Sequence, residues 1–225
     1  MKIGVIVLAR SNFGRWPDKI KAKLAGISMI ERVIERTIHL HEMDKIILST
    51  TDYPEDKWLI DLAGRYGIEC ITGPPDDRGL RYYEAVKKYS LDYFMPMPSN
   101  NPLFDIEALN LTTAAVREKP GYDYYAYAHA HNIGGVLTHI VDKKIIEQYK
   151  KTGTDQEMWF LSKETRKLFL LHGLDNLEIR NKYLIDLNVA YPLHVAILNK
   201  VIEHIGYYPL RYEELVEAFM EMKEL

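Results

Sequence analysis

The first hundred residues alternate short apolar runs with amphipathic segments, and this order restricts the fold more than any other feature of the chain. Mainly apolar runs at 3–8, 45–49, 69–72 and 93–97 have the length of buried strands. Between them, segments at 28–39, 54–66 and 79–89 have the composition and apolar spacing of helices. This alternation predicts an α/β fold, with a doubly wound, mostly parallel sheet and right-handed crossovers.

The second half of the chain is less regular. We expect helices at 105–118, 142–151, 191–205 and 213–224, a strand at 122–128, a turn at 133–136 and two strand-like pieces within 177–189. No internal repeat or low-complexity linker divides the 225 residues. We therefore predict one domain that spans residues 1–225.

The composition argues against several classes of protein. A net charge of −3 gives no global basic field, so we expect no nucleic-acid partner. The apolar runs are too short to span a bilayer, and the start of the chain leads directly into a strand without a signal peptide. Cys70 is the lone cysteine, which excludes an internal disulfide and a zinc site built from cysteines. A cytoplasmic protein that binds no membrane is the expectation.

A loop with three cations directly follows the first predicted strand. Leu8 ends the strand and Ala9 follows it. Arg10, Arg15 and Lys19 come next, at spacings of five and four residues. Ligands of open α/β sheets bind beyond the carboxyl ends of the strands. Guanidinium groups bind phosphate oxygens in a bidentate manner, and a lysine adds a point charge. The loop is therefore predicted to bind a polyphosphate, the alternative being a solvated basic loop.

Three motifs resemble the cytidylyltransferases that make CMP-activated sugar acids, most closely the branch named after a spore-coat polysaccharide protein. The cation loop is similar to that family's A-R-x-x-x-x-R-x-P-x-K. The stretch 73–83, which contains Asp76, Asp77 and Arg81, is similar to G-x-x-D-D-x-x-D-R-Y-Y, and 99–103 stands where the family has G-D-N-P-L. The resemblance is good over residues 1–110 and weaker beyond them.

The resemblance implies a nucleotide-diphospho-sugar transferase-like fold and CTP-dependent transfer of CMP to a sugar acid or similar small acceptor, with release of pyrophosphate. It implies Arg10, Lys19 and Asn100 as catalytic positions. It implies substrate contacts from these residues: Leu8, Ala9, Arg10, Asn12, Arg15, Lys19, Asp77, Arg81, Ser99 and Asn100. It also implies a homodimer, for which the tyrosine-rich segment 122–127 is a candidate interface.

The sequence departs from the family at the metal site. The family holds Mg²⁺ with the aspartates of G-D-N-P and V-D-T-P, whereas these places read Asn100 and Ala190 here. An amide oxygen adds a neutral ligand and a methyl group adds none, so we expect weak magnesium binding. The alternative is that Asp186, Asp105 or Asp92 supplies the carboxylate. Asp105 has the position of a helix N-cap, whereas Asp186 lies in a strand-like run and needs a partner or a metal.

Two further functions follow from these departures. Asn12-Phe13 replaces a Gly-Ser pair of the family and adds bulk where the backbone would approach phosphate. A degenerate, non-catalytic nucleotide or sugar-nucleotide binding protein on the same fold is thus the second hypothesis. A glycosyltransferase of related fold is disfavoured, because no Asp-x-Asp motif follows a central strand.

His129 and His131 have the spacing of metal ligands, but a surface role is favoured.

Overall fold

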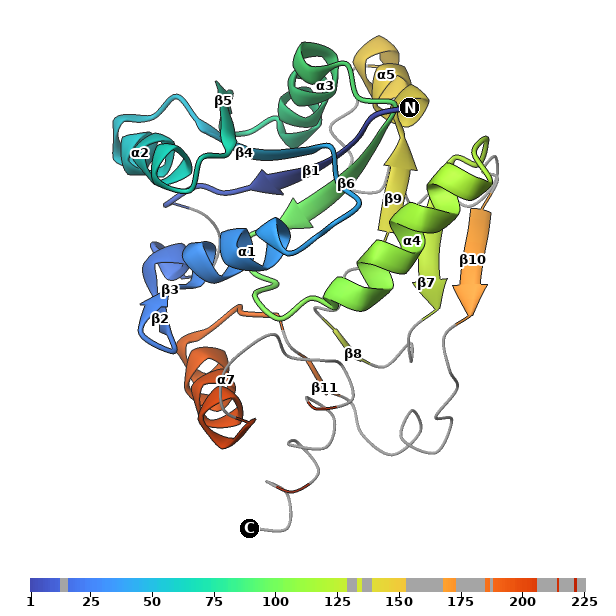
Figure 1. The fold of residues 1–225 in the computed structure, drawn as a ribbon. Helices are drawn as coiled ribbons and strands as arrows, with labels where there is room; N and C mark the ends of the chain where they lie inside the picture. Colours follow the sequence, from blue (N-terminus) through green and yellow to red (C-terminus); the bar gives the residue numbers. More distant parts are fainter. Residues whose placement is uncertain are drawn as a thin grey trace.

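A seven-stranded sheet is the frame of the protein (Figure 1). The computed structural model describes residues 1–12, 16–128, 133–134, 139–152, 168–172, 185–186, 188–205, 214 and 221. The strand order is β10-β7-β9-β6-β1-β4-β5. The strands are β1 (Ile3–Leu8), β4 (Lys45–Thr51), β5 (Glu69–Gly73), β6 (Tyr93–Pro98), β7 (Tyr124–Ala128), β9 (His139–Asp142) and β10 (Leu168–His172). Within this sheet β9 runs antiparallel to its neighbours β6 and β7, and the other pairings are parallel. The predicted doubly wound, mostly parallel α/β sheet is confirmed.

Helices cover both faces of the sheet (Figure 1). They are α1 (Met29–Ile38), α2 (Lys57–Arg65), α3 (Arg78–Tyr89), α4 (Ile106–Glu118), α5 (Lys143–Thr152) and α7 (Pro192–Ile205). Successive side chains of a strand point to opposite faces. In β1, Val5 and Val7 therefore pack in the core cluster that includes α1, α2 and α4, whereas Ile6 packs in the cluster that includes α3 and α5. Burial of β1 on both faces explains why its sequence is apolar throughout.

Two short elements follow the cation loop and were not predicted. A 3-10 helix, η1 (Lys19–Lys21), leads into a hairpin of β2 (Lys23–Leu24) and β3 (Ile27–Ser28). The turn residues Ala25 and Gly26 have φ angles of 49° and 90°, the left-handed conformation that two-residue hairpin turns use. Strands of two residues carry no periodicity, so the sequence pattern gives no signal for them.

The other differences from the sequence-based expectations lie in the second half. Strands β9 and β10 were not predicted, and β8 (Ile133–Gly134) pairs with β11 (Ile185–Asp186) where a turn was expected at 133–136. The expected helix at 213–224, apart from residues 214 and 221, and the pair His129 and His131 lie outside the described residues.

Some tyrosines lie in the core, and one of them, Tyr125, belongs to the segment 122–127 that is a candidate interface. Tyr125 is fully buried, and its hydroxyl donates to the Lys119 carbonyl. Tyr82 is also buried and packs on Phe94. Among the described residues, no helix is long and apolar enough to cross a membrane.

Candidate functional site

The carboxyl ends of the central strands form the floor of the candidate site. Strand β1 lies between β4 and β6, in the interior of the sheet. Its end is joined to both neighbours, because Ala9 N donates to Ser49 O at 3.1 Å and Ser99 N donates to Leu8 O at 3.2 Å. The segments that contain Leu8, Ala9 and Ser99 therefore lie side by side, as the parallel sheet predicts.

The cation loop is closed at its base by one backbone hydrogen bond. Asp18 N donates to Ser11 O at 2.8 Å, so the chain returns to the end of β1 just before Lys19. Lys19 is half-buried, and its burial lowers the pKa of its ammonium group. Asn12 is exposed, and Arg15 lies outside the described residues. The structure thus brings the segment that contains Lys19 back to Ser11, the residue after Arg10.

Arg10 connects the end of β1 to the loop between β5 and α3. Its Nη1 donates to Pro75 O at 2.7 Å and to Asp76 Oδ1 at 3.3 Å. The Asp76 side chain is 91% exposed, so this ion pair is open to solvent and screened. A ligand that carries phosphate groups could compete with Asp76 for the guanidinium.

Arg81 is a buried cation that is incompletely paired within the described part of the chain. The residue is 3% exposed, and its Nε and Nη1 make no hydrogen bond to any described residue. Burial lowers the pKa of the guanidinium, and the positive charges of Arg10 and Arg78 lower it further. Its stem lies over Gly73, where a Cβ atom would come within 2.9 Å of Arg81 Cγ. The negative charge of Asp56 acts in the opposite direction. A buried cation with further positive charges nearby is a place where an anion would be stabilised.

Asp77 has a structural role in the fold. Its Oδ1 accepts a hydrogen bond from Leu80 N at 2.7 Å, which caps the amino end of α3. The contact of Asp77 with a substrate stays a prediction.

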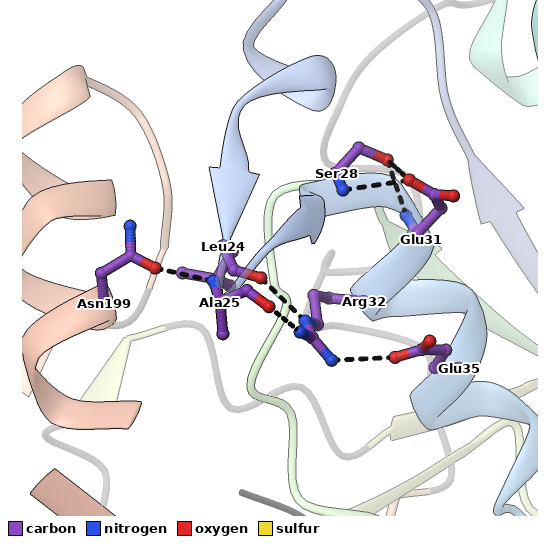
Figure 2. Close-up of polar contacts among 7 residues, drawn as sticks. All are labelled: Leu24, Ala25, Ser28, Glu31, Arg32, Glu35 and Asn199. Atoms are coloured by element: carbon purple, nitrogen blue, oxygen red, sulfur yellow. Dashed lines mark hydrogen bonds and ion pairs between the residues drawn. The ribbon is translucent and has the colours of Figure 1, made fainter. Parts of the chain in front are cut away.

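The hairpin that follows Lys19 is held by helices from both ends of the chain (Figure 2). Arg32 on α1 donates from Nε to Leu24 O at 2.8 Å and from Nη1 to Glu35 at 3.0 Å, and its Nη2 donates to Ala25 O. Asn199 on α7 accepts from Ala25 N at 2.7 Å. These contacts fix the hairpin, and with it one end of the cation loop. Sequence reasoning missed Arg32 and Asn199, since each reads as an ordinary polar helix residue.

The loop after β6 meets the segment before α7. Val189 N donates to Asn100 O at 2.9 Å, so Ala190 lies next in sequence to a residue paired with Asn100. His194 Nδ1 lies 2.6 Å from Asn188 O and 3.2 Å from Ala190 N, which fixes the turn. The predicted neighbourhood of Asn100 and Ala190 agrees with these backbone contacts.

The residues at this place do not fit a magnesium site held by carboxylates. Asn100 offers a neutral amide and Ala190 a methyl group, and the part of the chain that the structure describes holds no cluster of three His, Cys, Asp or Glu side chains suited to a metal. Asn101 adds a buried Oδ1 that accepts no hydrogen bond from the described residues, and this oxygen is again neutral.

Two of the three alternative carboxylates have other roles. Asp105 caps α4, because its Oδ1 accepts from Ala108 N at 3.0 Å. Asp92 lies at the amino end of β6, opposite to the site, where it pairs with Lys143 Nζ at 2.8 Å. The alternative that Asp92 supplies the metal-binding carboxylate is therefore wrong. For Asp186 the structure describes the backbone in β11 and not the side chain.

Comparison with known proteins decides which family this arrangement belongs to. A family model described as "Cytidylyltransferase" matches residues 4–224. The chain belongs to the cytidylyltransferase family. The resemblance found in the three motifs is thereby confirmed at the level of the family. The spore-coat branch and the replacement of the aspartates stay predictions.

Sequence relatives of the cytidylyltransferase match mainly one half of the chain. An uncharacterised protein of Methanocaldococcus jannaschii is 33% identical over 110 residues, which cover 49% of this chain and 45% of that protein. A 3-deoxy-manno-octulosonate cytidylyltransferase of Trichlorobacter lovleyi is 29% identical over 123 residues, covering 54% and 47%. The matched part thus spans about half the length of these curated relatives.

Solved structures share the fold over most of the chain. A cytidylyltransferase from Leptospira borgpetersenii has a TM-score of 0.87 at 18% identity, covering 100% of this chain and 96% of that one. A CMP:2-keto-3-deoxy-manno-octonic acid synthetase complexed with CTP has a TM-score of 0.60 at 12% identity, covering 77% and 91%. A Mycobacterium tuberculosis protein in complex with manganese scores 0.61 at 11% identity, covering 88% and 98%. At these identities the likeness supports the fold.

Proposed function

We propose that this protein is a CTP-dependent cytidylyltransferase that activates a sugar acid or a similar small acceptor as its CMP derivative. The observation that carries the proposal is the family match over residues 4–224, together with Arg10, Lys19 and Arg81 on loops and helices at the carboxyl edge of β1 and β5. The relatives named for 3-deoxy-manno-octulosonate and the neighbour complexed with CTP support the substrate class.

The reaction is a substitution at phosphorus. An acceptor oxygen attacks the α-phosphorus of CTP, the new oxygen–phosphorus bond forms, the α–β bridge breaks, and pyrophosphate leaves. Such transfer depends on positioning and on stabilising charge at the phosphate oxygens. Arg10 and Lys19 would bind the phosphates at the loop, and the positive field of Arg81 would favour the polyanion. Leu8, Ala9, Asn12, Ser99 and Asn100 would line the floor.

Divalent metal is a separate part of the proposal. A related fold has been solved with manganese, and the family resemblance implies Mg²⁺. Because Asn100 and Ala190 supply no anionic ligand, we propose that the arginines and Lys19 carry more of the charge neutralisation here than in relatives with two aspartates. No step of the reaction above depends on a metal held by these two residues.

The test is pyrophosphate release from CTP in the presence of a panel of eight- and nine-carbon 2-keto sugar acids. We expect release with one of them at enzymic rates, on the order of 1–10³ per second. CTP binding without turnover by any acceptor would instead favour the non-catalytic binding protein. Mass spectrometry of the CMP-linked product identifies the acceptor.

A further inference from the structure

Asp56 is the least exposed of the buried aspartates in the described part of the chain, at 1%. It ends the short 3-10 helix η2 (Pro54–Asp56), which leads directly into α2. Throughout the described residues, no lysine or arginine forms an ion pair with it. Burial of a carboxylate without an ion pair costs free energy unless both of its oxygens accept hydrogen bonds.

Both oxygens of Asp56 are used at the carboxyl edge of the sheet. Oδ1 accepts a hydrogen bond from Ser11 N at 2.6 Å. Oδ2 accepts from the hydroxyl of Thr51, the last residue of β4. Asp56 therefore joins the end of one central strand to the residue that directly follows Arg10.

Ser11 is the residue on which the cation loop closes. Its carbonyl accepts from Asp18 N, which closes the loop before Lys19. Its hydroxyl donates to Glu55 O at 3.2 Å and accepts from Trp58 Nε1 at 3.0 Å. With its amide on Asp56, Ser11 has each polar group engaged and is only 3% exposed. The two ends of the loop, joined in this way, need no reordering when the site binds a ligand.

We infer that Asp56 is a positioning residue of the nucleotide site, which holds Ser11 so that Arg10 and Lys19 face the phosphates of CTP. The inference rests on the proposed function, since it assigns the loop to phosphate. Asp56 would act through the cation loop, so its removal should affect contacts with the triphosphate and not with the base. Its effect on CTP affinity can therefore be distinguished from a general loss of stability.

The experiment compares variants of the full chain by equilibrium binding of CTP and of CMP and by thermal unfolding. Asp56→Ala is expected to weaken CTP binding about tenfold or more, because the Ser11 amide loses its charged acceptor. Binding of CMP, which lacks the β- and γ-phosphates, should change by less than about threefold. Asp56→Asn keeps an oxygen for Ser11 N and an amide that can donate to Thr51, so CTP binding should stay within about threefold of the wild type.

Asp44→Ala is the matched control, because Asp44 contacts the amino end of β1, whereas Asp56 contacts the segment after its carboxyl end. Asp44 Oδ2 accepts from Ile3 N at 2.7 Å, the same type of contact as that of Asp56 with Ser11. Its removal should lower the melting temperature and leave CTP affinity unchanged.

The outcomes separate the inference from the proposed function. A folded wild type that binds no CTP overturns both. If the wild type binds CTP and Asp56→Ala binds it with the same affinity, the positioning role of Asp56 is overturned and the proposed function is not. Equal losses of CTP and CMP affinity would also overturn it, because they indicate a general structural effect. If Asp56→Ala does not fold, Thr51→Val decides, with a loss of about threefold in CTP affinity expected and no change overturning the inference.

Discussion

At the scale of the residue, the site combines side chains that the sequence indicates with others that it hides. Arg10, Lys19 and Arg81 were predicted because cations after a buried strand, or in a recognisable motif, stand out. Asp56 and Asn199 were not, because each looks like an ordinary helix residue and contacts the cation loop or its hairpin from more than forty residues away. Contacts of this kind depend on packing and have no local pattern.

Arg10→Ala should weaken CTP binding by about ten- to hundredfold, consistent with the loss of one or two charge-assisted hydrogen bonds of roughly 1.5–3 kcal/mol each. Isothermal titration calorimetry measures this directly. Arg117→Ala is a matched control, because Arg117 also bonds a carbonyl, Glu42 O, and a carboxylate, Asp44. Loss of stability with unchanged CTP affinity in Arg10→Ala would mean that Arg10 is structural.

Arg81→Met should separate stability from binding. Methionine removes a buried, incompletely paired charge, so the free energy of unfolding should stay the same or rise by about 1–3 kcal/mol. CTP affinity should fall, because the positive field at the site is reduced. Denaturant unfolding and CTP titration of the same sample test both parts, and an unstable variant with normal affinity would refute the account of Arg81.

At the scale of the element, the first half of the fold was predictable because each strand and helix has its own periodicity. Strand β9 was missed because it is antiparallel, four residues long and continuous with α5. The hairpin 23–28 was missed because its stability comes from α1 and α7 and not from its own residues.

His139, the first residue of β9, should make the stability of the protein depend on pH. Burial lowers the pKa of His139 to about 4 from its ordinary value of 6.5, and its ring stacks on Tyr124. Between pH 6.5 and about 4 the unfolded chain binds a proton that the folded chain does not, so stability falls as pH falls through this range. The loss is on the order of 3 kcal/mol once the pH is below both pKa values. His139→Phe should flatten this part of the curve, whereas a curve parallel to that of the wild type would contradict the assignment.

At the scale of the whole molecule, the sheet brings segments that are far apart in the sequence to one edge. The contact of Val189 with Asn100 is the clearest case, since it joins the loop after β6 to the segment before α7. The sequence alone predicted this meeting through the family resemblance. The side-chain environment of Asp186 stays a prediction.

Asn100→Asp combined with Ala190→Asp should increase metal-dependent turnover of CTP, because two anionic ligands replace an amide and a methyl group. Neither single change should suffice, since one carboxylate leaves the ion under-coordinated. Pyrophosphate release with and without MgCl₂ measures the effect. If the unmodified protein already turns over at rates of about 1–10³ per second only with magnesium, Asp186 becomes the first candidate ligand.

The central claim is that the edge of the sheet beyond β1 binds CTP. Titration calorimetry with CTP, UTP, GTP and ATP, each with and without EDTA, tests it most directly. We expect CTP to bind about tenfold or more tightly than the other three, and chelation of divalent cations to change the CTP affinity by less than about tenfold. Absence of CTP binding, or equal affinity for all four nucleotides, would contradict the account.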